Sequence, residues 1–211
     1  QYTSSSDILE EVYSLTSPFF LMIYLIYLLV FIIAIPYTSI FEWILHKYPM
    51  HRPIGKFRYA FEAHAQVHHH QFKADHSYHL GNRDKSIAKK IPMAWWNILV
   101  LLPIANSPFC LLAWWMNNPW IAVISGIEIL AYYGAYEYIH WCMHLPKERR
   151  LEALWLFYRL NGHHVLHHRY MTVNFNVVLP FADWMFGTLM KRAKTRFAQV
   201  RGPMVPNVQP I

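Results

Sequence analysis

The chain contains little charge, little cysteine and little glycine, and each shortage excludes a class of protein. Of its 211 residues, 15% are charged and 55% are hydrophobic, whereas soluble domains are roughly 25% charged. The apolar content excludes a disordered chain, and two cysteines exclude a disulfide scaffold or a cysteine-rich zinc module. Seven glycines and thirteen prolines without a period exclude collagen-like and low-complexity proteins. What remains is a small membrane protein or an unusually apolar soluble one, of a length that suits one domain.

Lysine and arginine are absent from two long stretches. None of the 19 precedes Lys47 and none lies between Ile91 and Pro146, whereas nine fall within 47–90 and ten within 147–201. A nucleic-acid-binding protein would not normally exclude its basic residues from two such blocks. The net charge of +7 therefore does not indicate a nucleic-acid partner. Cytoplasmic loops of membrane proteins collect Lys and Arg, and this rule explains the gaps directly.

The stretches without basic residues are typical of membrane-spanning helices. Residues 18–40 form an uncharged apolar run, and crossing the hydrocarbon core requires about 20 such residues. The turn signal at 117–119, Asn-Asn-Pro, divides the second stretch into two helices. We expect spans at about 18–45, 92–116 and 119–144.

These helices predict an all-α integral membrane bundle with about three spans, or four, that forms a single domain over residues 1–211. Three crossings place the basic segments 46–91 and 145–211 on one side, which the distribution of Lys and Arg identifies as the cytoplasm. The N-terminus is then expected on the opposite side. Both basic segments are too small for an independent core, so we expect them to pack together as a helical cap on the bundle.

Fourteen histidines are the most unusual feature of the composition, and most lie in four clusters on the predicted cytoplasmic side. A lone histidine at a membrane interface is usually a polar tip, and a histidine-rich tract can be a loose surface metal binder. Neither interpretation explains four clusters, three with helical spacing. Ten imidazoles without a thiolate suit iron, copper, zinc or nickel, and two ions fit that number better than one. The proposed ligands are His46, His51, His64, His68, His69, His140, His144, His164, His167 and His168, with His163, His70 and His79 as weaker candidates.

The spacing within the clusters predicts how they share the two ions. Histidines three or four residues apart lie on one helix face, so the clusters at 140–144 and 164–168 are each expected to direct two or three imidazoles at one point. His69 lies about 140° from His64 on an α-helix, so the second cluster is expected to serve two centres.

Ligand histidines usually donate their second ring N–H to a fixed partner. Two acidic residues lie close before ligand clusters: Glu42 is four residues before His46, and Glu137 is three before His140. A charged residue near a membrane span is costly enough to suggest a function. We therefore expect both to support the ligands. Weaker candidates for this role are Asp75, Asn174 and Asp183.

Five motifs follow one another along the chain, and together they resemble a known superfamily. They are ExxxHxxxxH at Glu42–His51, HxxxHH at His64–His69, HxxxH at His140–His144, HxxHH at His164–His168 and the closing segment Asn174–Thr188. In this order they resemble the fatty acid hydroxylase and sterol desaturase superfamily of integral-membrane di-iron enzymes, over roughly residues 40–190. The chain departs from the pattern at Asn176, where glycine is common, and in the second cluster, which has three residues between its first two histidines where some members have two.

The resemblance implies two iron ions held only by histidine, with O2 as the oxidant and an acyl, sterol or related lipid as the substrate. Zinc could replace iron in a purified sample. No HPGG-type haem motif occurs in the sequence, so electrons are expected from a separate donor of the ferredoxin or cytochrome b5 type. We expect a monooxygenase that hydroxylates a lipid C–H bond. A lipid desaturase and a carotenoid hydroxylase are alternatives on the same metal site, and a membrane haem protein and a non-enzymatic metal-binding protein are rivals of other classes. The substrate-binding residues are not indicated.

Overall fold

A computed structural model describes residues 18–83 and 85–191, and these residues fold largely into helices. Within these two ranges the only β-type pairing is an isolated bridge between Ile54 and Phe57. The predicted all-α class is therefore confirmed. The N-terminal tail, which was predicted to lie across the membrane from the cap, and the C-terminal part of the predicted cap at 192–211 lie outside the described residues.

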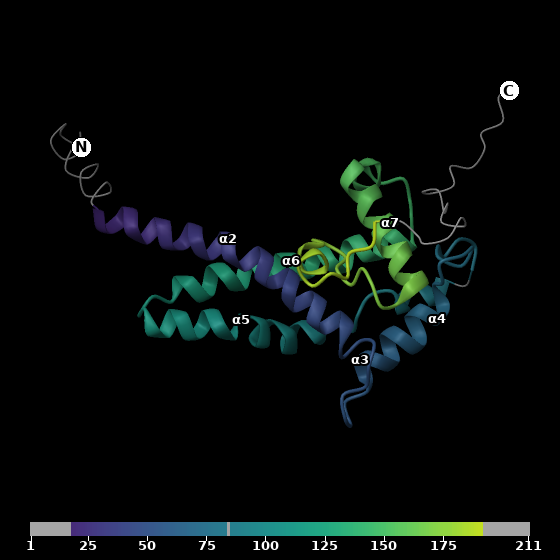
Figure 1. The fold of residues 1–211 in the computed structure, drawn as a ribbon, viewed down its shortest axis with the longest axis horizontal. Coiled ribbons are helices and arrows are strands. Elements are labelled where there is room, and N and C mark those ends of the chain that lie inside the picture. The colour runs from purple at the N-terminus through teal and green to yellow at the C-terminus, as the bar shows by residue number, and fades with distance from the viewer. Residues whose placement is uncertain (1–17, 84, 192–211) are drawn as a thin grey trace, which may run out of the picture.

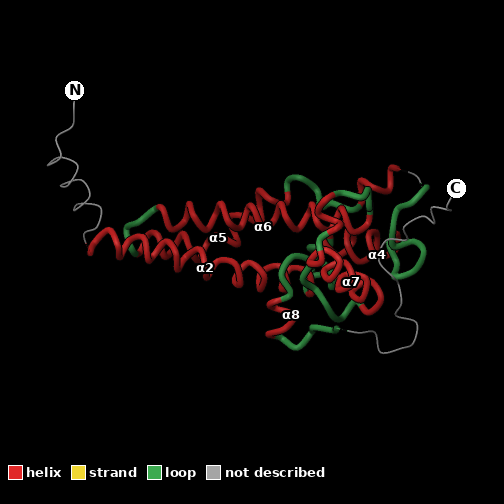
Figure 2. Tube along the Cα trace, turned by 90° about the horizontal axis from the view of Figure 1, so that it is seen from above, coloured by secondary structure: helices red, strands yellow, loops and turns green. Residues whose placement is uncertain are grey.

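Three long helices lie side by side and form the elongated part of the molecule (Figures 1 and 2). They are α2 (Pro18–Lys47), α5 (Asn97–Trp115) and α6 (Trp120–His144). Helices α5 and α6 are joined by a short turn in which Asn117 has a φ of 49°, a left-handed conformation that asparagine tolerates better than most residues. Helix α6 packs against both α5 and α2.

Small side chains and a few polar contacts hold the three helices together. Ala34, Ala105 and Ala113 are buried in their shared core, which lets the backbones approach closely. The Tyr37 hydroxyl donates a hydrogen bond to the carbonyl of Ala105 at 2.8 Å, and the Ser125 hydroxyl donates one to the Asn106 side chain at 2.7 Å. Association through small residues and interhelical hydrogen bonds is typical of helices in a membrane.

The outer surface of these helices is apolar. Leu21 on α2 and Leu99 and Leu111 on α5 are each more than half exposed. Both α2, from Phe20 onwards, and α5 are long and apolar enough to cross a membrane, as expected for two of the three predicted spans. The third, α6, matches its expected bounds and is long enough at 25 residues, but it is not among the helices that are apolar enough to cross a membrane. A crossing by α6 therefore stays a prediction.

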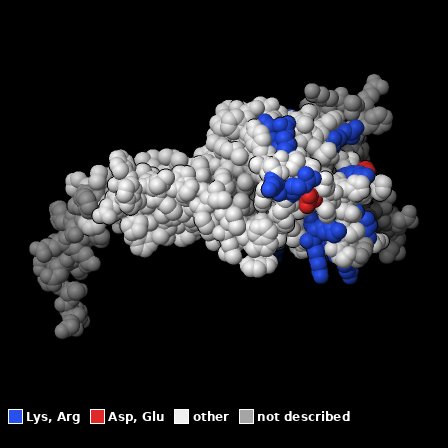
Figure 3. Space-filling view, turned by 90° about the horizontal axis from the view of Figure 1, so that it is seen from below, with Lys and Arg blue, Asp and Glu red and all other residues white. Residues whose placement is uncertain are grey.

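The remaining segments gather at one end of the long helices, which we call the histidine end (residues 46–83, 85–91 and 145–191). Its elements are α3 (Tyr59–Phe61), the π-helix η1 (Glu62–His68), α4 (His69–Gln71), the 3-10 helices η2 (Lys85–Lys90) and η3 (Arg150–Ala153), α7 (Trp155–Tyr170) and α8 (Phe181–Met185). On the face drawn in Figure 3, Lys and Arg gather over this end and leave the long helices bare. The segregation of charge in the sequence is thus a segregation in space.

Candidate metal centre

The histidine end encloses two groups of five histidine side chains. Within each group, one ring nitrogen from every histidine lies within 4.8 Å of the others. All ten histidines proposed as ligands belong to one group or the other, and all but His51 are buried. Site A consists of His46, His51, His64, His69 and His167, and site B consists of His68, His140, His144, His164 and His168.

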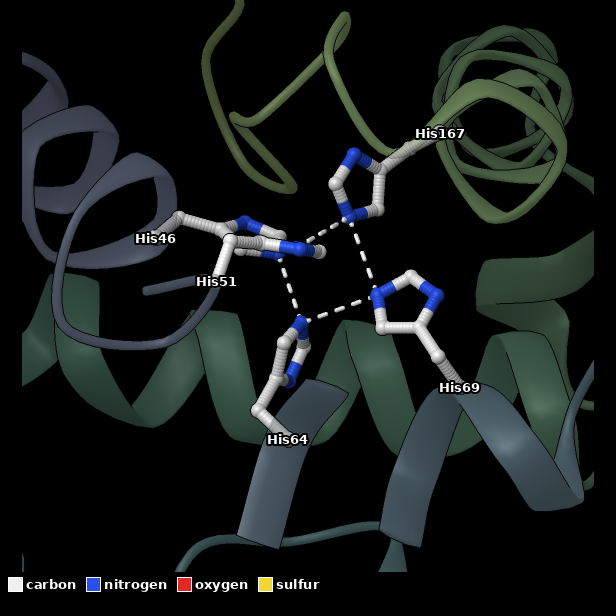
Figure 4. Close-up of side chains that lie close together, drawn as sticks. All are labelled: His46, His51, His64, His69 and His167. Carbon is white, nitrogen blue, oxygen red and sulfur yellow. Dashed lines mark hydrogen bonds between the residues drawn. The ribbon is translucent and has the colours of Figure 1, made fainter. Parts of the chain in front are cut away.

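Site A collects side chains from distant parts of the chain (Figure 4). His46 lies in the last turn of α2, and His51 follows in the turn after that helix ends. The chain doubles back there, so the two ring centroids are 5.3 Å apart. His64 comes from η1, His69 from α4 and His167 from α7. The five rings point toward one another in the figure.

The π-helix η1 decides how the second cluster is divided. On an α-helix, His64 and His69 would lie about 140° apart. A π-helix instead links residues five apart, and the backbone N–H of His69 donates to the carbonyl of His64. Their Nε2 atoms are consequently 3.1 Å apart in site A, while His68 faces site B. The cluster serves both sites, but the grouping follows the π-helical period.

Site B is built mainly from two α-helical pairs. His140 and His144 lie one turn apart on α6, and His164 and His168 lie one turn apart on α7, so each pair shares a face as expected. His167 does not join them. It lies about 100° from His168 around the helix and belongs to site A instead. Of the two or three imidazoles that this cluster was expected to direct at one point, two meet in site B.

The two sites are immediate neighbours. The rings of His64 in site A and His68 in site B are stacked with centroids 5.1 Å apart. The centroids of His69 in site A and His168 in site B are 4.2 Å apart. Two ions bound at these sites would thus occupy adjacent positions inside one shell of imidazoles.

Backbone carbonyls set the tautomer of four of these histidines. In site A, the Nδ1–H groups of His46 and His167 donate to the carbonyls of Phe175 and Val173. In site B, those of His144 and His168 donate to the carbonyls of Tyr78 and Phe72. A carbonyl oxygen only accepts, so Nδ1 carries the proton, and Nε2 of each neutral ring presents a lone pair to the site.

Hydrogen bonds among the rings cannot satisfy all of these lone pairs. In site B, Nε2 of His164 lies 3.2 Å from Nε2 of His144 and 2.9 Å from Nε2 of His168. Both neighbours present lone pairs there, and His164 has at most one proton on that nitrogen to donate. In site A, the single lone pair on Nε2 of His167 lies 3.1 Å from the Nε2 atoms of both His51 and His69 and can accept from only one of them. A cation that accepts several lone pairs satisfies such an arrangement, so the donor set fits a metal ion.

Burial keeps the imidazoles in the neutral form that binds metal. Removal from water lowers the pKa of His51 to about 4 and the pKa values of His68 and His167 to about 3. The pKa values of His64 and His69 are lowered well below 6.5, first by burial and then by neighbouring histidines. At neutral pH these rings therefore carry no charge and need lose no proton to bind a metal.

Glu42 does not receive an imidazole N–H, and the expectation that it would is corrected. Its carboxylate accepts hydrogen bonds from the Tyr132 hydroxyl at 2.7 Å, the Asn176 side chain at 2.9 Å and the backbone N–H of Val177 at 2.6 Å. The carbonyl of Phe175 takes the position beside His46 instead. Glu42 thus acts one step further away, because it fixes the loop that supplies this carbonyl.

Glu137 and Asp75 also have partners other than histidine. The Glu137 carboxylate accepts from the backbone N–H of Met93 at 3.2 Å and from the Tyr133 hydroxyl, and thereby links α6 to the segment that precedes α5. Asp75 is exposed and accepts from the backbone and side chain of Ser77. The predicted support of ligands by these two residues is corrected, since each carboxylate is engaged elsewhere.

Asp183 does receive an imidazole N–H, but from a histidine outside both sites. Its carboxylate lies 3.0 Å from Nε2 of His163 and accepts from the backbone N–H groups of Phe175 and Asn176 at 2.9 and 2.8 Å, and from the Thr188 hydroxyl at 2.7 Å. Burial raises the pKa of Asp183. The hydrogen bonds from His163, Thr188 and Asn176 lower that pKa by more than burial raises it, so the net shift is downward. The carboxylate is an anchor for the loop beside site A.

Asn174 closes the same loop. It is fully buried with a φ of 56°, which asparagine adopts more readily than most residues. Its side chain donates to the carbonyls of His163 and Met190 at 3.1 and 3.0 Å and accepts from the N–H of Met190 at 2.6 Å. Asn174 thus holds backbone, whereas we expected it to hold an imidazole.

The three weaker ligand candidates lie outside both sites. His163 is paired with Asp183, and His70 is exposed on α4. His79 is partly buried, with an Nε2 atom that has no hydrogen-bond partner. None of the three belongs to either group of ligand atoms among the described residues.

A cavity of about 80 Å³ between α2, α5 and α6 reaches site A. Its lining is almost entirely apolar and includes Phe41, Leu45, Leu101 and Ile129, with His46 as the member that belongs to site A. No ligand of site B lines this cavity. Most of the cavity residues come from three helices, with Met50 and Met93 from the segments beside them, and they form no sequence motif, so inspection of the sequence could not find them.

Comparison with protein-family models, with curated proteins and with solved structures finds no match to this chain. The two histidine sites, the cavity and the sequence motifs are therefore the features that bear on function.

Proposed function

We propose that this protein is an integral-membrane di-iron monooxygenase that hydroxylates a C–H bond of a lipid, in the manner of the fatty acid hydroxylase and sterol desaturase superfamily that its motifs resemble. The observation that carries the proposal is the pair of adjacent five-histidine sites. Ten imidazoles at one place, nine of them buried, exceed what a structural metal needs, because a structural zinc ion uses four ligands.

The donor set favours a metal of borderline character. Among the described residues, the two groups of potential ligand atoms contain only imidazole nitrogens, and such ligands suit iron, copper, zinc and nickel. When bound, two ferrous ions would supply the power to oxidise an unactivated C–H bond, with O2, two electrons and two protons giving an alcohol and water. Zinc fits the same nitrogen ligands and is expected to compete for them during overexpression.

The chain itself holds and orients the histidine rings and keeps water away from the site. The carbonyls of Phe175, Val173, Tyr78 and Phe72 lock four ligand rings with Nε2 toward the sites. Glu42 and Asp183 hold the loop that supplies the first two carbonyls. The cavity places an apolar chain beside His46, which keeps bulk water away from the carbon to be oxidised.

The membrane supplies the substrate in this proposal. Helices α2 and α5 present apolar outer surfaces, and the cavity lies between them and α6. A lipid can thus pass from the bilayer to site A without crossing water. The histidine end, with its Lys and Arg residues (Figure 3), is proposed as the cytoplasmic cap, where a separate ferredoxin or cytochrome b5 type donor delivers electrons.

Metal analysis and oxygen-dependent turnover test the proposal together. The purified protein should bind about two iron ions per chain and, given reductant and a lipid extract, should incorporate one atom of ¹⁸O2 into an alcohol. His144→Ala and His168→Ala should abolish turnover without preventing membrane insertion. His76→Ala is the matched control, since His76 is exposed and outside both sites.

Other experimental outcomes would favour an alternative function. An alkene as the sole product would identify a desaturase on the same metal site. Metal uptake without oxygen-dependent chemistry after iron loading would identify a metal-binding protein. A haem is disfavoured because the facing Nε2 atoms in site A are 2.8 to 3.1 Å apart, which leaves no room for a porphyrin between two rings; a Soret band would contradict this reasoning.

A further inference from the structure

The short helix α8 lies beside α2 rather than beyond its end (Figure 2). At the start of α8, the Ser39 hydroxyl donates to the carbonyl of Leu179 at 2.6 Å and accepts from the backbone N–H of Ala182 at 3.3 Å. Just after α8, the rings of Phe186 and Trp43 have centroids 4.4 Å apart. The sequence assigns this segment to the cap, but its contacts place it along the last turns of a helix that is expected to cross the membrane.

The depth of α8 can be measured along α5. The Tyr37 hydroxyl donates to the carbonyl of Ala105, so α2 and α5 are level there. Ala105 is eight residues from Asn97, where α5 begins at the histidine end, and this corresponds to about 12 Å. Ser39 is two residues nearer the histidine end than Tyr37. The start of α8 therefore lies about 9 Å inside the level at which α5 begins.

That depth matches the boundary of a membrane crossed by α5, as the proposed function requires. Helix α5 has 19 residues and is about 28 Å long, close to the thickness of about 30 Å of a hydrocarbon core. Helices that lie on a membrane bury their apolar face about 5–10 Å into the boundary between head groups and acyl chains. Helix α8 lies within this range.

The exposed side of α8 is apolar and aromatic. Ala182 and Asp183 face inward and are fully buried. Trp184 is 66% exposed, and Met185 and Phe186 are each more than 40% exposed. Tryptophan is enriched at the boundary between a membrane and water, and contiguous exposed apolar side chains mark a surface of interaction. The acidic residue of α8 is thus turned away from this surface and the aromatic residues are turned toward it.

Lysines lie on the shallower side of these apolar residues. Lys47 ends α2, about 12 Å beyond Ser39, and its Nζ lies 4.1 Å from the centroid of the Trp43 ring. Lys191 is exposed shortly after Thr188, whose hydroxyl accepts from Nε1 of Trp43 at 2.9 Å. Lysines next to an apolar membrane surface extend toward the head groups and attract anionic lipids.

We propose that α8 is an interfacial helix that lies between the head groups and acyl chains of the leaflet at the histidine end, with Trp184, Met185 and Phe186 in contact with phospholipid. The inference rests on the membrane location in the proposed function. It adds a lipid contact to the segment that also supplies the Phe175 carbonyl to His46, so the bilayer supports the mounting of site A.

The size of the exposed surface argues against a second copy of the chain as its occupant. A stable protein interface has roughly 20–30 residues on each side, whereas α8 offers three exposed apolar side chains. A bilayer needs no such area from α8, because the long helices already hold the chain in it. The exposed side of α8 continues the apolar surface of α2, on which Ile44 is also exposed.

Fluorescent labels on single cysteines measure the depth of α8 in metal-free protein, without turnover. The background is Cys110→Ser, since Cys110 is exposed whereas Cys142 is buried. An NBD fluorophore is attached at Met185→Cys, and the protein is placed in nanodiscs that hold one chain each. Phospholipid with a doxyl group near the head-group end of its acyl chain should quench this label several-fold more strongly than aqueous iodide does.

Two other labelled positions calibrate the measurement. Leu111→Cys, on the exposed surface of α5, should be quenched by the doxyl lipid, and His76→Cys, exposed at the histidine end, should be quenched by iodide. A label at Met185→Cys that iodide quenches as strongly as the label at His76→Cys would overturn the inference. A label shielded from iodide only in vesicles that hold several chains would also overturn it, because a second copy would then cover α8.

An unlabelled variant gives an independent check. Trp184→Phe keeps the side chain apolar and aromatic, so it should fold like the wild type. Brominated phospholipid should quench less of the tryptophan fluorescence in this variant than in wild-type protein. Identical quenching in the two proteins would contradict the proposed lipid contact of Trp184.

This inference and the proposed function fail in different ways. Absence of oxygen-dependent product after iron loading, with a lipid-quenched label at Met185→Cys, would reject the monooxygenase alone. Product formation with an iodide-quenched label at Met185→Cys would reject only the position of α8. Quenching by iodide at Leu111→Cys as well would reject the membrane location on which both rest.

Discussion

Replacing Asp183 with asparagine should weaken site A far more than site B. The carboxylate is fully buried and accepts from two backbone N–H groups, one hydroxyl and one imidazole at 2.7 to 3.0 Å. Asparagine keeps one oxygen but replaces the other with an NH2 group, which is a donor. Either orientation of the amide places its NH2 group against a backbone N–H, that of Phe175 or of Asn176, so at least one hydrogen bond becomes a donor–donor contact and the others lose a charged acceptor.

The magnitude follows from that contact together with the loss of the charged acceptor. A hydrogen bond to a charged group contributes about 1.5–3 kcal/mol, so Asp183→Asn should lower the free energy of unfolding by about 3 kcal/mol or more. For a chain of this length about 1 kcal/mol lowers the melting temperature by about 2–4 °C, so a decrease of about 6–12 °C is expected. Asp75→Asn is the matched control: Asp75 is exposed and bonded only to Ser77, and surface substitutions typically change stability by less than about 0.5 kcal/mol.

The selectivity between sites comes from the loop that Asp183 anchors. Its hydrogen bond to the N–H of Phe175 fixes the segment whose carbonyls hold His46 and His167 in site A. The carbonyls that hold site B ligands belong to Tyr78 and Phe72, which lie elsewhere in the chain. Loss of such indirect support typically lowers metal affinity about 10-fold to 100-fold.

Zinc titration against a chelator, followed by metal analysis, measures the two affinities. His51→Ala and His144→Ala assign them to site A and site B. In Asp183→Asn, the affinity assigned to site A should fall and the other should remain. The reasoning is refuted if both affinities fall equally, or if neither changes while the protein stays as stable as wild type.

Three further predictions follow from the same structure. Metal-free protein should lose stability as the pH falls from 6.5 toward 4. Burial lowers the pKa of His51 to about 4 and that of His68 to about 3, so the unfolded chain takes up protons at a higher pH than the folded chain does. A free energy of unfolding in denaturant that is the same at pH 7.5 and pH 5 would contradict this. Glu42→Gln should destabilise the protein by about 1–3 kcal/mol, since the amide puts a donor where the carboxylate accepts from Tyr132, Asn176 and Val177. Thermal unfolding measures this loss of stability. The control Glu62→Gln, at an exposed ion pair with Arg58, should have almost no effect. Accessibility tags at Gln1 and Ile211 should report opposite sides of the membrane if α6 spans it as α2 and α5 are expected to, and tags on the same side would rule out three spans.

Much of the site could be predicted because many of its histidines are spaced so that they share one face of a helix. The pairs His140 and His144, and His164 and His168, meet because four residues make one turn of an α-helix. All ten histidines of the two sites could be selected because so many histidines in an apolar chain have no simpler explanation. The bounds of α6 followed in the same way, from a turn signal and an uninterrupted helical stretch.

The division of ligands between the two sites could not be predicted so directly. The π-helix at Glu62–His68 changes which of two neighbouring histidines faces site A, and nothing in the local sequence specifies that extra residue per turn. The supporting partners were also missed for a physical reason. Every residue has a backbone carbonyl, so only the folded chain reveals that those of Phe175 and Tyr78 receive imidazole N–H groups.

The sequence by itself determined which apolar segments form helices, which end of the protein is basic and which ten of the fourteen histidines are candidate ligands, because periodicity and charge are local properties. The tertiary structure decided which of these features contact one another. It brought Glu42 to the loop at 176–177 rather than to a histidine, and it formed an apolar cavity between α2, α5 and α6 beside His46. Such relations depend on contacts between residues far apart in the chain, and no local pattern records those contacts.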